Sequence, residues 1–178
     1  MYVSEIKITP PEEFKTDLQK LVYETLAKLK IPFERVDNDP TITMEDCIGI
    51  DARLGAKTSK TLFLCNRQKT AFYLFAIAGD KPFSTKIFSH TLGVARVSFA
   101  TKEMLLSMVG TEIGASTILG ALLDKEHKIR IVFDSEILES EWFVCTDTTR
   151  TCYMKLRTND VIKKFLPYTG HEITVIKM

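Results

Sequence analysis

The chain has 178 residues, with 24 lysines and arginines against 23 aspartates and glutamates, which gives a formal net charge of +1. A chain of this length can fold as one domain without disulfides or a structural metal, and its balanced charge excludes a generally polycationic nucleic-acid-binding protein. Its four cysteines lack the C-x-x-C spacing of zinc sites, and its longest apolar runs, such as residues 71–78, are shorter than the roughly 20 residues of a membrane span. Because the opening residues also lack an apolar signal core, we expect a cytoplasmic protein with reduced thiols, no membrane contact, no metal and no other cofactor.

The first half of the chain alternates strand-like and helical patterns. Residues 2–8 have a strand-like pattern, and the prolines at positions 10 and 11 favour the start of a helix. The apolar positions of this helix recur at helical spacing up to Pro32: Leu18, Leu21, Val22, Leu26 and Leu29. The remaining elements expected in this half are a strand at 33–36, a turn at 37–40, a short capped helix at 43–47, a loop to residue 55, and a hairpin of two apolar strands at 61–65 and 71–78.

The second half continues the alternation. Helices are expected at residues 84–92 and 101–109, where Gly93 and Gly110 provide the C-terminal caps. The other expected elements are strands at 97–100, 129–133, 142–145, 151–156 and 173–176, a helix at 159–166, and a segment at 116–122 that fits either a strand or a helix. The sequence contains no repeat or linker, so we expect residues 1–178 to form one α+β domain with a mixed sheet.

Lys60 stands directly before an apolar strand. An ammonium group at the end of a buried strand lies where loops form pockets and where anionic ligands are bound. The alternative is a solvated lysine at the strand end, which the residue pattern alone favours.

A second candidate segment runs from Gly110 to Thr117 and carries glycines at positions 110 and 114. Glycines allow a tight turn, and backbone N–H groups freed in such a turn can bind the oxyanion that forms during ester hydrolysis. An ordinary helix C-cap at Gly110 followed by a loop fits the pattern equally well.

The third candidate segment contains Cys145. A thiol nucleophile needs a base, and none of His90, His127 and His171 has a convincing partner position, so a buried, unreactive thiol is the favoured interpretation. The three histidines also lack metal-ligand spacing, which favours structural or surface roles. Scattered basic residues could surround one mouth and bind RNA, although plain solvated charge is the favoured interpretation for any one of them: Lys57, Lys60, Arg67, Lys69 and Lys86.

Several strings of residues, in order from about residue 26 to the C-terminus, resemble the YbaK and prolyl-tRNA editing domain family, which occurs free-standing and inserted in bacterial prolyl-tRNA synthetases. These strings are Ile31-Pro32-Phe33, Asp39-Pro40, Thr43-Met44-Glu45-Asp46, Lys60-Thr61-Leu62-Phe63-Leu64, Leu92-Gly93 with Val97-Ser98-Phe99-Ala100, Gly110-x-x-x-Gly114 with Gly120-Ala121-Leu122, and Phe165-Leu166-x-x-Thr169-Gly170-His171-Glu172. The resemblance implies a mixed, partly barrel-like sheet flanked by helices.

The resemblance also implies site residues. Lys60 matches the family's essential lysine, and Gly114 lies in its glycine-rich loop, so both are expected in catalysis. The substrate-binding residues expected from it are Ala115, Thr117, Thr146 and Thr151, and the tRNA-binding residues are Lys57, Arg67 and Lys86.

The sequence departs from the family pattern at several positions. Isoleucines at positions 113 and 118 replace the usual prolines, and Cys145 or Thr146 stands where many members carry histidine. Asn38 also stands where relatives often have histidine. Catalysis in the family is believed to depend on positioning, backbone donors and the vicinal hydroxyl of the substrate, so these changes need not abolish activity.

The function implied by the resemblance is deacylation of mischarged tRNA in trans, most plausibly alanine attached to proline tRNA. The alternatives are the same hydrolysis on cysteine- or serine-charged tRNA, and a non-catalytic relative that binds tRNA or a regulatory partner. The implied partners are the aminoacylated acceptor end of tRNA and, more indirectly, prolyl-tRNA synthetase, but not DNA.

Overall fold

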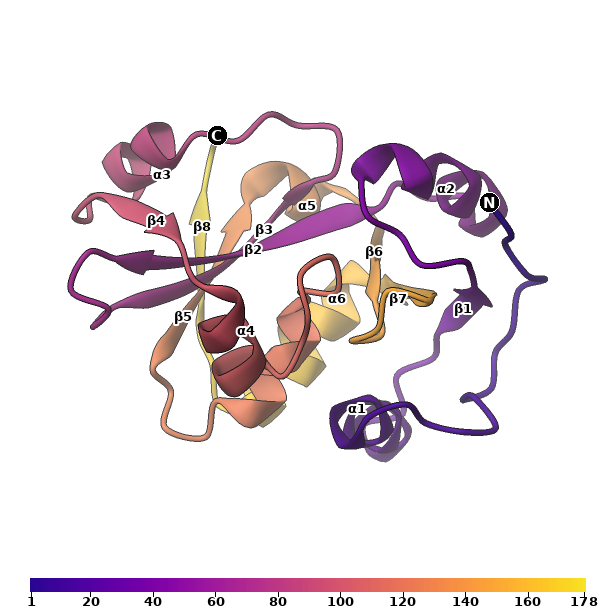
Figure 1. Ribbon diagram of the computed structural model, residues 1–178. Coiled ribbons are helices and arrows are strands. Elements are labelled where there is room, and N and C mark those ends of the chain that lie inside the picture. Colours follow the sequence, from indigo (N-terminus) through magenta and orange to yellow (C-terminus); the bar gives the residue numbers. More distant parts are fainter.

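The computed structural model describes residues 1–178 and contains two β-sheets surrounded by helices (Figure 1). The strands are β1 Glu34–Asp37, β2 Ser59–Asn66, β3 Phe72–Ala78, β4 Val97–Phe99, β5 Ile129–Asp134, β6 Trp142–Thr146, β7 Cys152–Arg157 and β8 Ile173–Ile176. The α-helices are α1 Asp17–Lys28, α2 Ile48–Leu54, α3 Thr85–Leu92, α4 Lys102–Val109, α5 Ser135–Glu139, α6 Thr158–Asp160 and α7 Leu166–Thr169. Two 3₁₀ helices, η1 Met44–Cys47 and η2 Ile118–Leu123, and a π-helical stretch, η3 Val161–Phe165, complete the fold. None of these helices is long and apolar enough to cross a membrane.

The larger sheet is mixed, as expected. Its strand order is β4-β2-β3-β5-β8, with antiparallel pairing of β3 to β2 and parallel pairing of β3 to β5. The smaller sheet has the antiparallel order β1-β7-β6. The two sheets do not close into a barrel; they meet where Thr58 bridges Val144 and the Ser59 hydroxyl donates to the Val144 carbonyl at 2.7 Å. The start of β2 therefore lies against the smaller sheet.

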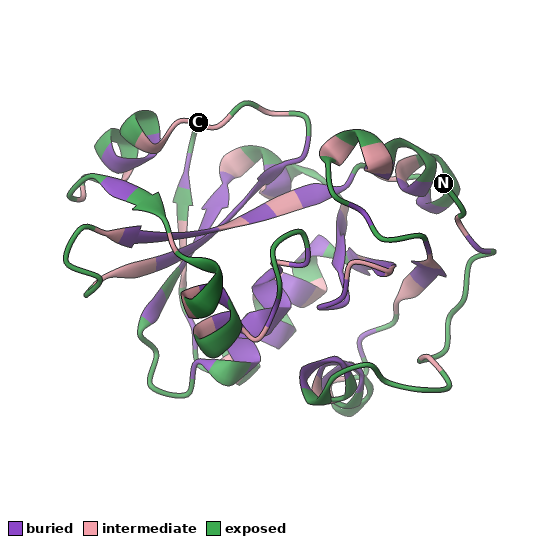
Figure 2. Ribbon diagram, in the orientation of Figure 1, coloured by how far each residue is buried: buried purple, intermediate pink, exposed green.

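Strand β3 forms the centre of the core because both of its faces are covered. Leu74 and Ala76 pack in the main hydrophobic cluster, whereas Tyr73, Phe75 and Ile77 pack in a second cluster on the opposite face. Figure 2 shows β3 and β5 buried along almost their whole length. A strand buried on both faces has a continuous apolar sequence, which explains the unbroken run at 71–78.

Three expected elements differ from the structure. Residues 2–8 do not form a strand, because they reach β1 only through isolated bridges at Val3 and Lys7. The first helix begins later than expected, at Asp17, where the Thr16 hydroxyl accepts from the Gln19 amide at 3.0 Å. Residues 48–54, expected as loop, form α2, and the unassigned segment 116–122 forms η2.

Candidate active site

A small cavity of about 180 Å³ lies where the start of β2 meets the smaller sheet. Three segments line it besides β2: the loop at residues 41–44, the loop between α4 and η2, and the ends of β6 and β7 that face each other. The sequence-predicted residues that line this cavity are Lys60, Gly114 and Thr146. Gly114 and Thr146, which follow Lys60 by 54 and 86 positions in the sequence, thus lie at one site with it.

Lys60 is half-buried, and its ammonium group does not extend into solvent. The Nζ atom donates to the carbonyl oxygens of Lys81 at 2.5 Å and Gly79 at 3.3 Å, in the turn after β3. Burial lowers the pKa of Lys60 below its ordinary value, against the opposing attraction of Asp80. The lysine is held by neutral carbonyls, which leaves its charge uncompensated by a direct ion pair and able to attract an anionic or polarised group.

The glycine-rich loop uses its two glycines differently. Gly110 is the C-cap of α4 in the left-handed conformation, which is the helix-capping role considered for it in the sequence. Gly114 has a φ of +87°, and a Cβ atom there would lie 3.1 Å from Cδ of Arg150. The turn uses the Ala115 amide, which donates to the Glu112 carbonyl at 3.0 Å. The amides of Gly114 and Ser116, unlike that of Ala115, have no acceptor within the protein, and both residues line the cavity.

Hydroxyl groups line the cavity, and sequence reasoning missed most of them. Thr146 Oγ1 donates to the Ala115 carbonyl at 2.8 Å and fixes the glycine-rich loop to β6. The hydroxyls of Thr61, which is 7% exposed, and of Ser116 have no hydrogen-bond partner. Orphaned polar groups beside a cavity indicate a site for a polar ligand or water. The alternation of β2 could have revealed Thr61, because residues 59, 61 and 63 share one face of the strand.

Cys145 and Thr117 do not line the cavity. Burial raises the pKa of the Cys145 thiol to about 12, so this cysteine is neutral at physiological pH, in agreement with the unreactive interpretation. Thr117 is completely buried and caps η2 by accepting from the Leu119 amide. The predicted substrate-binding role of Thr117 is therefore replaced by a structural one.

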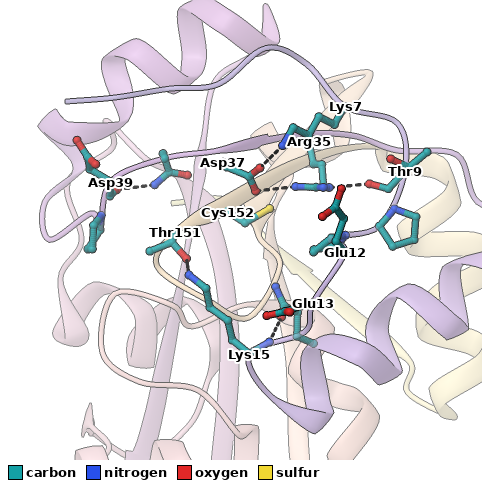
Figure 3. Close-up of a pocket in the computed structure, with 15 residues that line it drawn as sticks. Lys7, Thr9, Glu12, Glu13, Lys15, Arg35, Asp37, Asp39, Thr151 and Cys152 are labelled. Carbon is teal, nitrogen blue, oxygen red and sulfur yellow. Dashed lines mark hydrogen bonds and ion pairs between the residues drawn. The ribbon is translucent and has the colours of Figure 1, made fainter.

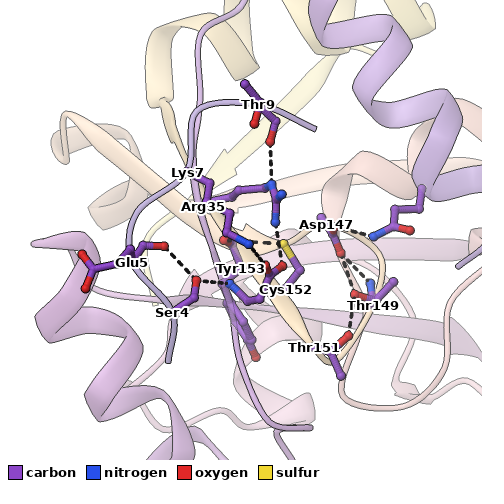
Figure 4. A network of polar contacts seen from close by, with 12 residues as sticks. Ser4, Glu5, Lys7, Thr9, Arg35, Asp147, Thr149, Thr151, Cys152 and Tyr153 are labelled. Atoms are coloured by element: carbon purple, nitrogen blue, oxygen red, sulfur yellow. Dashed lines mark hydrogen bonds and ion pairs between the residues drawn. The ribbon is translucent and has the colours of Figure 1, made fainter. Parts of the chain in front are cut away.

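Asp147 organises the turn between β6 and β7 (Figure 4). Its carboxylate is fully buried and accepts from the Gln19 side chain at 2.7 Å and the Tyr23 hydroxyl at 2.9 Å. It also accepts from the amide and the hydroxyl of Thr149. Helix α1 is thereby fastened to a turn more than 120 residues away. No local sequence pattern could have identified this contact.

Thr151 lies outside the small cavity, contrary to its predicted role in the same site. It lines a polar cavity of about 640 Å³ beside the N-terminal segment, where the Lys15 ammonium bonds its hydroxyl (Figure 3). Three of the other charged residues of that cavity pair with one another, since Asp37 binds both Lys7 and Arg35 at 2.6 Å. Thr151 also lines another cavity, of about 350 Å³.

The three predicted tRNA-binding residues do not surround one mouth. Lys57 pairs with Asp80 at 2.8 Å, Arg67 lies in the turn at the opposite end of β2, and Lys86 is on the exposed surface of α3. None of them lines the cavity that contains Lys60. They are separate solvated charges because β2 holds Lys57 and Arg67 at its two ends. The chain also contains no group of three or more potential metal-ligating side chains, and all four cysteines are free and buried.

Comparison with known proteins agrees with the resemblance drawn from the sequence motifs. Residues 41–164 match the aminoacyl-tRNA editing domain family. The prolyl-tRNA editing protein ProX of Acetoanaerobium sticklandii is 27% identical, with 91% of this chain and 98% of that protein aligned. Prolyl-tRNA synthetase associated domain-containing protein 1 of Bos taurus is 26% identical over 90% of this chain and 95% of its own length.

Solved structures share the fold. The crystal structure of a proposed trans-editing enzyme for prolyl tRNA synthetase superposes with a TM-score of 0.67 at 17% identity, covering 93% of this chain and 99% of that one. The structure of hypothetical protein APE2540 gives a TM-score of 0.66 at 18% identity, covering 87% and 97%. The family match includes the cavity, the glycine-rich loop and the Asp147 turn. The chain belongs to the aminoacyl-tRNA editing domain family and is a hydrolase of the aminoacyl-tRNA deacylase class.

Proposed function

We propose that this protein acts in trans on mischarged proline tRNA and hydrolyses the ester of attached alanine. The observation that carries the proposal is the small cavity that combines Lys60, the free Gly114 amide and unpartnered hydroxyls. A volume of about 180 Å³ suits a small aminoacyl group better than a larger one. A second, hydrolytic site that selects by size is useful because one or two methylene groups give a synthetase only modest discrimination in binding.

The proposed reaction begins with water adding to the ester carbonyl carbon. The electron pair of the carbonyl moves to its oxygen, and the amides of Gly114 and Ser116 donate to that oxyanion. The tetrahedral intermediate then collapses, the ester oxygen of the terminal ribose leaves as a hydroxyl, and the amino acid is released. Lys60 anchors the aminoacyl-adenosine end.

In this proposal the substrate's own vicinal hydroxyl relays the proton: it accepts a proton from the attacking water and passes its own proton to the leaving ester oxygen. No carboxylate or imidazole lines the cavity, and its other titratable group, Tyr153, has its pKa raised by burial. Burial therefore keeps the Tyr153 hydroxyl protonated, and its hydrogen bond with the Thr41 hydroxyl at 3.0 Å gives it a structural role. This arrangement supports catalysis by positioning and backbone donors rather than by a protein nucleophile.

Serine-charged tRNA is the second candidate substrate. The free hydroxyls of Thr61 and Ser116 favour it, because each could bond a substrate hydroxyl that alanine lacks. A cysteinyl group is also small enough for the cavity.

A panel of proline tRNAs charged with alanine, serine, cysteine or proline tests this function. Under single-turnover conditions, with spontaneous hydrolysis subtracted, we expect alanyl-tRNA to be hydrolysed fastest and prolyl-tRNA to be spared. Serine ahead of alanine would make the seryl ester the substrate. No enzymatic hydrolysis of any of the four would contradict the function and favour a non-catalytic tRNA-binding relative.

Gly114→Ala should slow hydrolysis strongly at a modest cost in stability. An L-residue at φ +87° is strained by roughly 1 kcal/mol, and the new methyl group would press on Arg150. The shifted loop would misplace the oxyanion donors, so we expect a loss of roughly tenfold to a hundredfold in single-turnover rate.

Gly93→Ala is the matched control for Gly114→Ala. Gly93 has a similar φ of +70° but no atom within 4 Å of an added Cβ, and it lies at the end of α3. It should lose similar stability and keep its rate. Equal rates for the two variants would refute the role of the Gly114 loop.

A further inference from the structure

A second cavity, of about 350 Å³, adjoins the small one. It lies between the turn at residues 148–151, the start of α1 and the loop after α4. The two cavities are separated by the glycine-rich loop, because Gly114 lines the small cavity and Ala115 lines the second. Arg150, which lines the second cavity, also approaches Gly114 closely. The two cavities therefore lie on either side of one short loop.

Thr148 marks the second cavity as a built site. It is a β-branched residue at φ +89°, a backbone conformation that such residues rarely adopt. It is 4% exposed, lines the cavity, and its hydroxyl has no hydrogen-bond partner. A strained backbone and an orphaned hydroxyl at one buried residue that lines a cavity point to a bound ligand or water there. The Asp147 network holds the turn in this conformation, since Asp147 accepts from Thr149 twice.

The charges of this cavity select an anion. Lys15 has no acidic partner and bonds only the Thr151 hydroxyl through its ammonium group. Arg150 is 38% exposed in its side chain and has one loose ion pair, to Glu112 at 3.8 Å. The N-terminus of the 12-residue helix α1, capped by Thr16, lies at the same cavity and adds positive potential, which Asp17 in the first turn of the helix partly offsets. Two cations, a helix N-terminus and several threonine hydroxyls face one carboxylate, which is a set of groups suited to phosphate.

We propose that the second cavity binds a phosphodiester of the RNA strand whose terminal ribose carries the ester. This inference rests on the proposed function. It assumes that the aminoacyl group occupies the small cavity, and this position determines where the adjoining nucleotides of the RNA lie. The strand leaves that cavity past Gly114 and runs between Arg150 and the start of α1. The basic side chains that hold the RNA are thus Lys15 and Arg150, in place of Lys57, Arg67 and Lys86.

Salt dependence of RNA binding is the first test. Uncharged acceptor-stem RNA ending in CCA is titrated by fluorescence anisotropy at several salt concentrations. Lys15→Met and Arg150→Met should each weaken binding about fivefold or more, and each should reduce the log–log salt slope by roughly 0.7–0.9, the value for one phosphate contact. The surface control Lys86→Met should change neither quantity. Equal behaviour of the control and the two variants would overturn the site.

A neutral methylphosphonate at each of the last two linkages of the RNA, in turn, supplies the second test. At one of the two linkages, the methylphosphonate should weaken binding to the wild type about as much as Lys15→Met weakens binding of unmodified RNA. The Lys15→Met variant should then bind the RNA modified at that linkage almost as well as it binds unmodified RNA. Fully additive losses at both linkages would overturn the proposal.

Thr148→Gly separates binding from folding. Glycine removes the φ strain and the hydroxyl together, so the variant should be at least as stable as wild type but bind RNA more weakly. Unchanged RNA binding with raised stability would contradict the assignment of Thr148. The mischarged-tRNA panel remains independent of these tests. If mischarged tRNA is hydrolysed but the losses of RNA affinity in the methylphosphonate test are additive, the proposed function stands and this RNA site is refuted. If those losses are coupled but no mischarged tRNA is hydrolysed, the RNA site stands and the proposed function is refuted.

Discussion

Lys60→Ala should remove most deacylation, about a hundredfold in single-turnover rate, while the melting temperature stays close to that of wild type. The ammonium group positions the terminal nucleotide in the proposed reaction, and misplacing a reacting group by roughly an ångström costs about this factor. Because the pKa of Lys60 is lowered by burial in the folded protein, the charged form is better solvated in the unfolded chain. The charge therefore opposes folding below the folded-state pKa, and this cost disappears as the pH rises above the unfolded value. Removing this cost offsets the loss of the two hydrogen bonds to the Gly79 and Lys81 carbonyls, so the melting temperature should change little at neutral pH.

The pH dependence of the wild type provides a second measurement on Lys60. Its lowered pKa means that the ammonium loses its proton at a lower pH than an exposed lysine does. After subtraction of spontaneous ester hydrolysis, the enzymatic rate should therefore decrease with rising pH, and this decrease should begin at a lower pH than the ordinary pKa of lysine would give. Lys81→Ala is not a useful control, because Lys81 binds the buried Asp134 at 2.6 Å. Lys57→Ala is suitable, because this lysine is exposed. Equal rates in Lys60→Ala and Lys57→Ala, with wild type active, would contradict the role of Lys60.

Asp147→Asn should have the largest effect on stability. All four groups that bond this buried carboxylate are donors, and an amide NH₂ in place of one oxygen would leave two of them facing another donor. We expect a loss of about 3 kcal/mol in unfolding free energy, or a fall in Tm of roughly 6–12 °C for a chain of this size. Rate and RNA affinity should fall as well, because the turn that carries Thr148 and Arg150 loses its anchor.

Tyr23→Phe is the control for the Asp147 network. It removes one donor and leaves the carboxylate with the other three, so it should cost only about 1 kcal/mol. The double variant should lose less than the sum of the two single losses, because both substitutions disrupt the same hydrogen bond. A Tm for Asp147→Asn within about 2 °C of wild type would refute the network as a source of stability.

The sequence predicted those features that depend on short-range patterns. The hairpin of β2 and β3, the capped helices α3 and α4, and the placement of Lys60 at a strand end all follow from residues within one element or turn. The family strings located Gly114 in a loop whose φ of +87° favours glycine. Thr146 was placed near the site by the resemblance, because it or Cys145 stands where many members of the family carry histidine.

The remaining site residues depend on contacts that no local pattern encodes. Asp147 and Gln19 are 128 residues apart, and Lys15 meets Thr151 across 136 residues. Lys57 and Arg67 are close to Lys60 in the sequence, but residues on the two sides of an extended strand lie far apart in space. Lys57 and Arg67 therefore lie at opposite ends of β2, while the distant Lys15 and Arg150 line one cavity. The expected strand at 2–8 failed because only isolated bridges connect it to β1.

A crystal structure with a non-hydrolysable alanyl-adenosine analogue, in which an amide replaces the ester, tests the central claim most directly. The account predicts the alanyl group in the cavity of about 180 Å³, its carbonyl oxygen within hydrogen-bond distance of the Gly114 and Ser116 amides, and the adenosine beside Lys60. An analogue bound elsewhere, with the small cavity left empty, would contradict it.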